Sequence, residues 1–176
     1  MGGLTPRQKA ARMATRLDYN QVLSASPARV RGVLLDPDYV RAKAERTGAF
    51  DIEVDVTTQA DGRATLTCTR SMPAEVPSYA TAFVGEHLTI TEVQEWSAPD
   101  ATGAATAAVT VDFHAPLAYR GTITLTGDGS TSTLANRGEF KANVPFVGGK
   151  VERVASEMTE KYLAKETQVA SEWLAT

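Results

Sequence analysis

The sequence predicts an α+β fold in which a curved, seven-stranded antiparallel sheet surrounds one long C-terminal helix. Seven segments alternate apolar and polar residues, which is the period of half-buried strands. Asp61-Gly62 and Asp128-Gly129 are typical of hairpin turns, which join antiparallel strands. Residues 150–175 repeat apolar side chains at steps of three and four, the pattern of an amphipathic helix that needs a sheet to pack on.

The patterned chain begins with a strand and two short helices. Residues 15–25 alternate as a strand. Ser26-Pro27 and Asp36-Pro37 each place a helix cap before a proline at the first helical position. Short helices are therefore predicted at 26–35 and 39–46, and Gly48 is a plausible end signal for the second. We expect residues 1–13 to form a flexible N-terminal extension and residues 14–176 to form one domain.

Six further strands are expected at residues 50–56, 64–72, 87–98, 105–113, 119–125 and 130–144. Val93 breaks the alternation of its strand, so a bulge is expected there. Residues 73–86 are too long for a tight turn and show helical spacing from Val76 to Phe83. A connection of this length is typical of a lid or binding loop. On the last helix, the face opposite the apolar stripe carries charged residues: Glu152, Arg153, Glu157, Glu160, Lys161 and Lys165.

Composition excludes several classes of protein. The chain has 176 residues, of which 43% are hydrophobic and 22% charged, as in a soluble globular domain. A net charge of −3 and the lack of a basic stripe argue against nucleic-acid binding. No apolar stretch reaches the roughly 18 residues of a membrane span. The single cysteine, Cys68, rules out an intrachain disulfide, and a cytoplasmic location is expected. The oligomeric state stays open.

Motifs for common catalytic chemistry are missing. The sequence contains no GxSxG, HExxH or CxxC, and its two histidines, His87 and His114, lie far apart. Asp112 and His114 share a strand face, but no nucleophile accompanies them. We therefore predict no metal and no cofactor, and we expect both histidines to be structural or surface residues.

Polar residues on apolar faces of the strands are the better candidates. Arg70 shares the face of Leu66 and Cys68, and a buried arginine needs a partner. Glu92, together with Gln94, lies on the apolar face of the neighbouring strand, so Arg70 and Glu92 are a predicted pair. Asn136 and Gln21 hold similar positions. Such a set can orient the polar group of a ligand in an apolar cavity, or strand ends and bulges can turn these side chains to solvent.

Aromatic and apolar residues complete the predicted ligand-binding set. Tyr79 and Phe83, in the 73–86 segment, would gate a cavity or simply cap the core. Met158 and Tyr162 face the sheet by their helical spacing, and Tyr119 and Phe140 lie on apolar strand faces. The chain also contains 27 alanines, so its strands offer few bulky side chains to fill the space under the helix.

The order of elements resembles the helix-grip fold of the START-like (SRPBCC) superfamily, which includes Bet v 1, lipid-transfer START domains and polyketide cyclases. Within it, the chain is similar to DUF2505, an actinobacterial family of unknown function. The residues that carry this likeness are TRLDYNQVLSASPARV, MPAEVPSYATAFVGEHLTITEVQEW and PFVGGKVERV. The resemblance implies an elongated cavity for a hydrophobic ligand between the sheet and the last helix, but a shared fold fixes no activity.

Three functions remain open from the sequence. The leading one is a cytoplasmic binding or carrier protein for a lipid or another small hydrophobic ligand, with no cofactor and no transmembrane segment. The alternative is a cyclase or dehydratase type of enzyme, for which Arg70 and Glu92 are the weak catalytic candidates. An interaction module for a partner protein is a third, which a large exposed apolar patch would favour.

Overall fold

The computed structural model describes residues 14–176, so the predicted extension at residues 1–13 lies outside the described residues. The division into an extension and one domain stays a prediction. The elements follow the chain as β1 (Thr15–Leu23), α2 (Pro27–Leu34), α3 (Pro37–Arg46), β2 (Phe50–Thr58), β3 (Ala64–Pro73), α4 (Ser78–Val84), β4 (His87–Trp96), β5 (Ala105–Ala115), β6 (Leu117–Gly127), β7 (Ser132–Ala142) and α5 (Gly148–Leu174).

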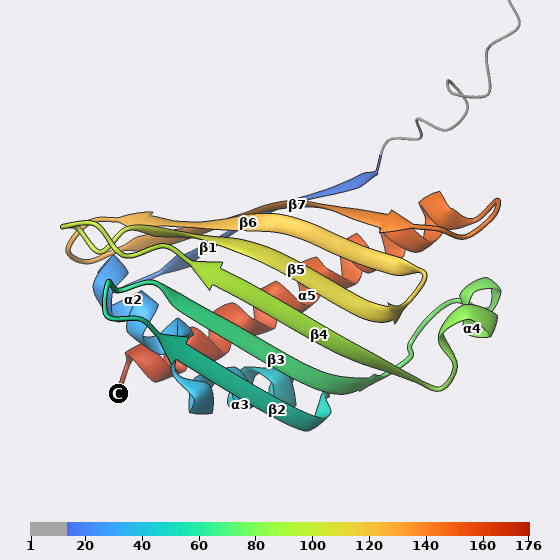
Figure 1. Ribbon diagram of the computed structural model, residues 1–176, viewed down its shortest axis with the longest axis horizontal. Helices are drawn as coiled ribbons and strands as arrows, with labels where there is room; N and C mark the ends of the chain where they lie inside the picture. Colours follow the sequence, from blue (N-terminus) through green and yellow to red (C-terminus); the bar gives the residue numbers. More distant parts are fainter. Residues whose placement is uncertain (1–13) are drawn as a thin grey trace, which may run out of the picture.

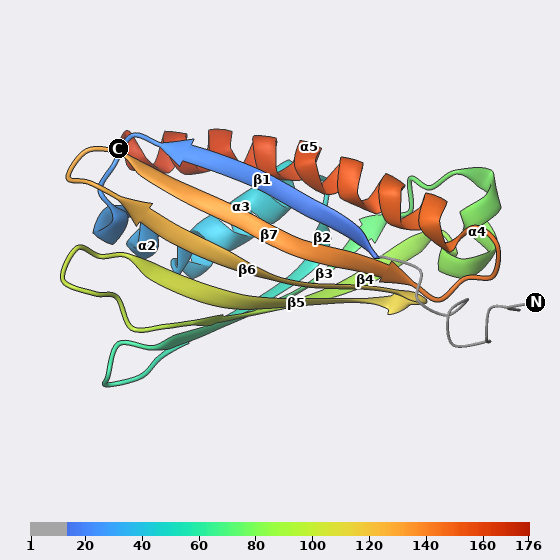
Figure 2. The same cartoon turned by 90° about the horizontal axis from the view of Figure 1, so that it is seen from above.

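The seven strands form one antiparallel sheet in the order β1-β7-β6-β5-β4-β3-β2. Consecutive strands from β2 to β7 are neighbours, joined by short connections except between β3 and β4, where α4 intervenes. β1 joins the far edge beside β7. The sheet curves around α5, which runs along its length, while α2 and α3 lie near the C-terminal end of α5 (Figures 1 and 2). The predicted fold class is confirmed.

The cap signals in the sequence form the helix starts that they predict. The Ser26 hydroxyl accepts a hydrogen bond from the Arg29 amide at 3.4 Å, and the Asp36 carboxylate accepts one from the Asp38 amide at 2.9 Å. After the C-cap of α3, Gly48 takes a φ of +94°, a conformation that glycine adopts without strain. These caps bring α3 beneath the sheet, where its side chains can reach α5.

The core lies between the inner face of the sheet and the helices. Tyr39 of α3 meets Trp173 of α5 edge to face, with ring centroids 5.9 Å apart. A small cluster of buried residues contains Ala44, Ala49, Met72 and Ile90. The main cluster is much larger, and its fully buried side chains include Leu23, Val30, Leu66, Leu125, Phe140 and Val169. Cys68 is buried in this cluster as a free thiol.

Two details of the sequence prediction are wrong. β4 pairs with both neighbours without a break at Val93, and the register shifts lie instead at Phe50/Glu53 and Asp112/Ala115. The first shift takes Phe50 off the buried face of its strand and leaves it 38% exposed.

The second error concerns the polar face of α5. Glu152, predicted to face solvent, is fully buried. It belongs to a row at steps of four with Gly148 and Ser156, which are also buried. The Ser156 hydroxyl donates to the Arg16 carbonyl of β1 at 3.4 Å, so this row of small and polar side chains is the one that packs towards β1.

Candidate functional site

Two adjoining chambers lie between the inner face of the sheet and α5. The outer chamber, of about 90 Å³, lies at the end of the molecule that carries α4. The inner chamber, of about 140 Å³, extends towards α3. Both are lined by Met72, Ile90, Phe113, Thr159 and Tyr162. The two chambers therefore adjoin at these shared residues.

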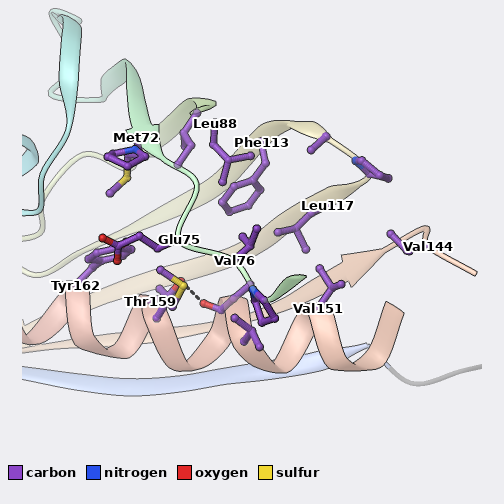
Figure 3. Close-up of a pocket in the computed structure, with 18 of the residues that line it drawn as sticks. Met72, Glu75, Val76, Leu88, Phe113, Leu117, Val144, Val151, Thr159 and Tyr162 are labelled. Carbon is purple, nitrogen blue, oxygen red and sulfur yellow. Dashed lines mark hydrogen bonds between the residues drawn. The ribbon is translucent and has the colours of Figure 1, made fainter. Parts of the chain in front are cut away.

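The walls of the outer chamber are almost entirely apolar. In Figure 3, Phe113 and Leu117 of the sheet and Val151 of α5 point towards one another across it. Val76, from the segment between β3 and α4, lies beside this space. Among the described lining residues, Glu75 is the only charged one. This chamber suits the apolar part of a ligand.

The inner chamber contains the ion pair that the sequence predicts. Arg70 Nη2 donates to Glu92 Oε2 at 3.3 Å, and the two side chains are only 16% and 17% exposed. In the β3–β4 register Arg70 lies opposite Ile90, so Glu92 is its diagonal neighbour on the same face. Gln94 Nε2 donates to the second Glu92 oxygen at 2.6 Å, and Trp96 Nε1 donates to Gln94 at 2.9 Å. Each oxygen of Glu92 thus has a donor.

A second ion pair, which sequence reasoning missed, joins the helices beside the first. Lys43 Nζ of α3 donates to Glu166 Oε2 of α5 at 3.4 Å, with exposures of 15% and 20%. Lys43 also lies 5.8 Å from the centre of the Tyr39 ring. Lys43 follows buried Tyr39 by four residues, and Glu166 follows Tyr162 by four, so helical spacing was the signal available in the sequence.

The two ion pairs favour the charged forms of Glu92 and Lys43. Burial opposes the ionisation of Glu92, but the Arg70 and Lys43 cations and the hydrogen bond from Gln94 hold its pKa below the usual range. Burial likewise opposes the charge on Lys43, while the Glu166 carboxylate holds its pKa above the usual range. The inner chamber therefore contains two cations and two anions at neutral pH.

Tyrosine hydroxyls add neutral polar groups to the cavity walls. Burial raises the pKa of Tyr119 to about 12, with a further contribution from the Glu92 charge. The Tyr119 ring lies over Gly121 and Gly138, which pair across β6 and β7. A Cβ at either glycine would collide with the Tyr119 ring, so these two positions need glycine for the close approach. The two glycines therefore leave space for the Tyr119 ring, which lines the inner chamber.

Asn136 and Gln21 close one side of the inner chamber. Asn136 Nδ2 donates to Gln21 Oε1 at 3.1 Å, and Gln21 Nε2 donates to the Leu163 carbonyl and to Thr167 Oγ1 at 3.1 and 3.0 Å. Both side chains are buried. The alternative in which these polar residues turn to solvent is wrong. Their hydrogen bonds join the β1–β7 edge to α5.

The structure brings eight of the nine predicted ligand-binding residues into the cavity walls. Tyr79 and Met158 line the outer chamber, Tyr162 lines both, and the inner chamber is lined by Arg70, Glu92, Tyr119, Asn136 and Phe140. The side chain of Phe83 lies outside the described residues. The role of these nine residues in ligand binding stays a prediction.

The two histidines line neither chamber. His87 packs edge to face on Phe50, and His114 Nε2 lies 3.2 Å from the Thr91 hydroxyl, where both side chains are accessible to solvent. No three His, Cys, Asp or Glu side chains in the described part of the chain gather closely enough to hold a metal ion. Of the helices described, none is both long and apolar enough to cross a membrane.

An antiparallel sheet wrapped around a C-terminal helix is the helix-grip fold. Residues 18–174 match the family described as "Protein of unknown function (DUF2505)". The chain belongs to this family. No curated protein matches the sequence.

Solved structures share this fold at low sequence identity. The protein TTHA0849 from Thermus thermophilus has a TM-score of 0.58 at 14% identity, over 90% of this chain and 95% of that one. The Zhui aromatase/cyclase from a Streptomyces species also has a TM-score of 0.58, at 15% identity over 90% and 92%. Norcoclaurine synthase from Thalictrum flavum has 0.55, at 15% identity over 99% and 94%. These likenesses establish the fold alone.

Proposed function

We propose that the protein is a cytoplasmic binding or carrier protein that holds one lipid or other small hydrophobic molecule in the two chambers. The observation that carries this proposal is that an apolar outer chamber adjoins an inner chamber with hydrogen-bonding groups. Ligand sites commonly combine apolar walls with a few placed polar groups. The proposed contacts at the polar end are Arg70, Glu92, Tyr119 and Asn136.

Apolar burial supplies the affinity in this proposal. Transfer of about 200 Å² of apolar ligand surface out of water contributes about 5 kcal/mol, before the entropic cost of association. Met158, Phe140 and Tyr162 form apolar walls, and Tyr79 stands beside the outer chamber with 37% of its surface exposed. We assign Tyr79 the role of a gate, with Phe83 of the same helix as its predicted companion.

A polyketide cyclase or dehydratase type of enzyme is the second candidate, because the Arg70–Glu92 pair does lie inside the cavity. Acid–base catalysis works best with a pKa near the working pH. Here the pKa of Glu92 is lowered, that of Lys43 is raised, and that of Tyr119 is raised to about 12. Because these pKa values are shifted away from neutral pH, the groups suit ligand binding better than proton transfer.

The test is native mass spectrometry of the purified protein, alone and after incubation with a library of lipids and small apolar compounds. The proposal predicts one bound molecule per chain. Ala155→Phe, which fills the outer chamber from α5, should abolish the complex. Gln168→Phe is the matched control, because it adds the same side chain at an exposed position of α5. A wild-type protein that retains no compound, or equal binding by Ala155→Phe, would contradict the proposal.

A further inference from the structure

We propose that the ligand is an amphiphile whose polar end is uncharged and accepts hydrogen bonds, such as a ketone, ester or alcohol, and not a fatty acid anion or an alkyl ammonium. This inference rests on the proposed function, since it specifies the chemistry of the molecule in the cavity. Three features of the inner chamber carry it: the balance of its charges, its surplus of donors and its low exposure.

The charges of the inner chamber already cancel. Its charged lining residues are two cations, Lys43 and Arg70, and two anions, Glu92 and Glu166. They form two direct pairs at 3.4 and 3.3 Å. The pairs also act on each other, because Lys43 contributes to the lowered pKa of Glu92 and Glu166 contributes to the raised pKa of Arg70. No cation in this set lacks an anion, so none awaits a charged ligand.

An ion that entered this chamber would break the balance. All four charged side chains are between 15% and 20% exposed, so water screens them weakly. A carboxylate or an ammonium would lose its hydration and would either remain uncompensated or displace a partner from an existing pair. Both outcomes carry the cost of an unpaired buried charge. A neutral group carries neither.

Hydrogen-bond donors outnumber acceptors in the same place. A guanidinium has five N–H groups and an ammonium three, whereas Arg70 and Lys43 donate one bond each to their partner carboxylates. Both oxygens of Glu92 are already occupied by donors. The Tyr119 hydroxyl can donate as well. A ligand oxygen that accepts hydrogen bonds fits this surplus, and a group that only donates does not.

The test is a titration with four probes of equal chain length: decan-1-ol, 2-decanone, decanoate and decylammonium at pH 7.4. Trp96 lines the inner chamber and reports occupancy by fluorescence, and Trp173→Phe removes the other tryptophan. We expect 2-decanone and decan-1-ol to bind at least tenfold more tightly than either ion. Decanoate or decylammonium binding as tightly as the neutral probes would overturn this inference while leaving the proposed function intact. If none of the four binds, both fail.

Two variants test the charge argument itself. Glu92→Gln leaves Arg70 without its anion, so decanoate should gain at least tenfold in affinity relative to decan-1-ol. Glu172→Gln is the matched control, because its ion pair with Arg46 lies outside the cavity with side chains 49% and 58% exposed. It should leave the ratio of the two affinities unchanged. An unchanged ratio in Glu92→Gln, or an equal shift in Glu172→Gln, would show that charge balance does not select the ligand.

Discussion

Removal of one partner of the Arg70–Glu92 pair is the perturbation that the structure makes most specific. In Glu92→Gln, the amide keeps the shape of the carboxylate and can still accept from Gln94, but Arg70 loses its counter-charge. Loss of one member of a buried pair costs about 3–5 kcal/mol. Because the Arg70 side chain is 16% exposed, we expect the lower end, about 3 kcal/mol.

The assay is urea unfolding, with the far-ultraviolet circular dichroism signal measured at equilibrium. In thermal unfolding, the same loss of about 3 kcal/mol should lower the Tm of a chain of this size by about 6–12 °C. Arg70→Met/Glu92→Gln removes both charges, and its cost should be at least about 1 kcal/mol less than the sum of the two single changes. A cost of less than about 1 kcal/mol for Glu92→Gln, which is typical of exposed pairs, would refute the reasoning. Additive single changes would refute it as well.

Three further predictions concern other parts of the same cavity. Gly138→Ala should destabilise the protein by about 1–3 kcal/mol in urea unfolding, because a Cβ at this position collides with Tyr119. In Gly129→Ala the added Cβ meets no atom within 4 Å, so the stability should change by less than about 0.5 kcal/mol. The lowered pKa of Glu92 gives a stabilisation that is present above its unfolded pKa and is lost as the pH falls through the folded pKa. Wild type should therefore lose stability more steeply than Glu92→Gln below about pH 4.5. Parallel curves of stability against pH for the two proteins would contradict this. Burial raises the pKa of the Cys68 thiol, so iodoacetamide should label it slowly in buffer and rapidly in urea, and equal rates would contradict its burial.

Much of the fold could be predicted because it depends on local patterns. Alternation in the strands, the hairpin turns and the caps at Ser26 and Asp36 all act within a few residues of the chain. The positions of the bulges could not be predicted in this way. The shift at Phe50/Glu53 depends on how β2 meets β3 across the sheet, so the polarity of β2 alone points Phe50 inwards.

The candidate site could also be predicted only where it depends on local patterns. Arg70 and Glu92 could be paired from the sequence because consecutive antiparallel strands bring their shared faces together. Lys43 and Glu166 lie 123 residues apart, on two helices whose relative position only the folded chain defines. Their positions four residues after Tyr39 and Tyr162, which both line the cavity, marked them as facing inwards but gave no indication of a partner.

The central claim is that a ligand occupies the cavity between the sheet and α5. Methyl NMR of protein labelled at methionine tests it most directly, because Met158 lines the outer chamber and Met72 lines both. Substitution of each by leucine assigns its signal. During a titration with decan-1-ol, the account predicts that both methyl signals shift and saturate at one molecule per chain. If both signals stay in place while the protein remains folded, the cavity does not bind such a ligand and the account is contradicted.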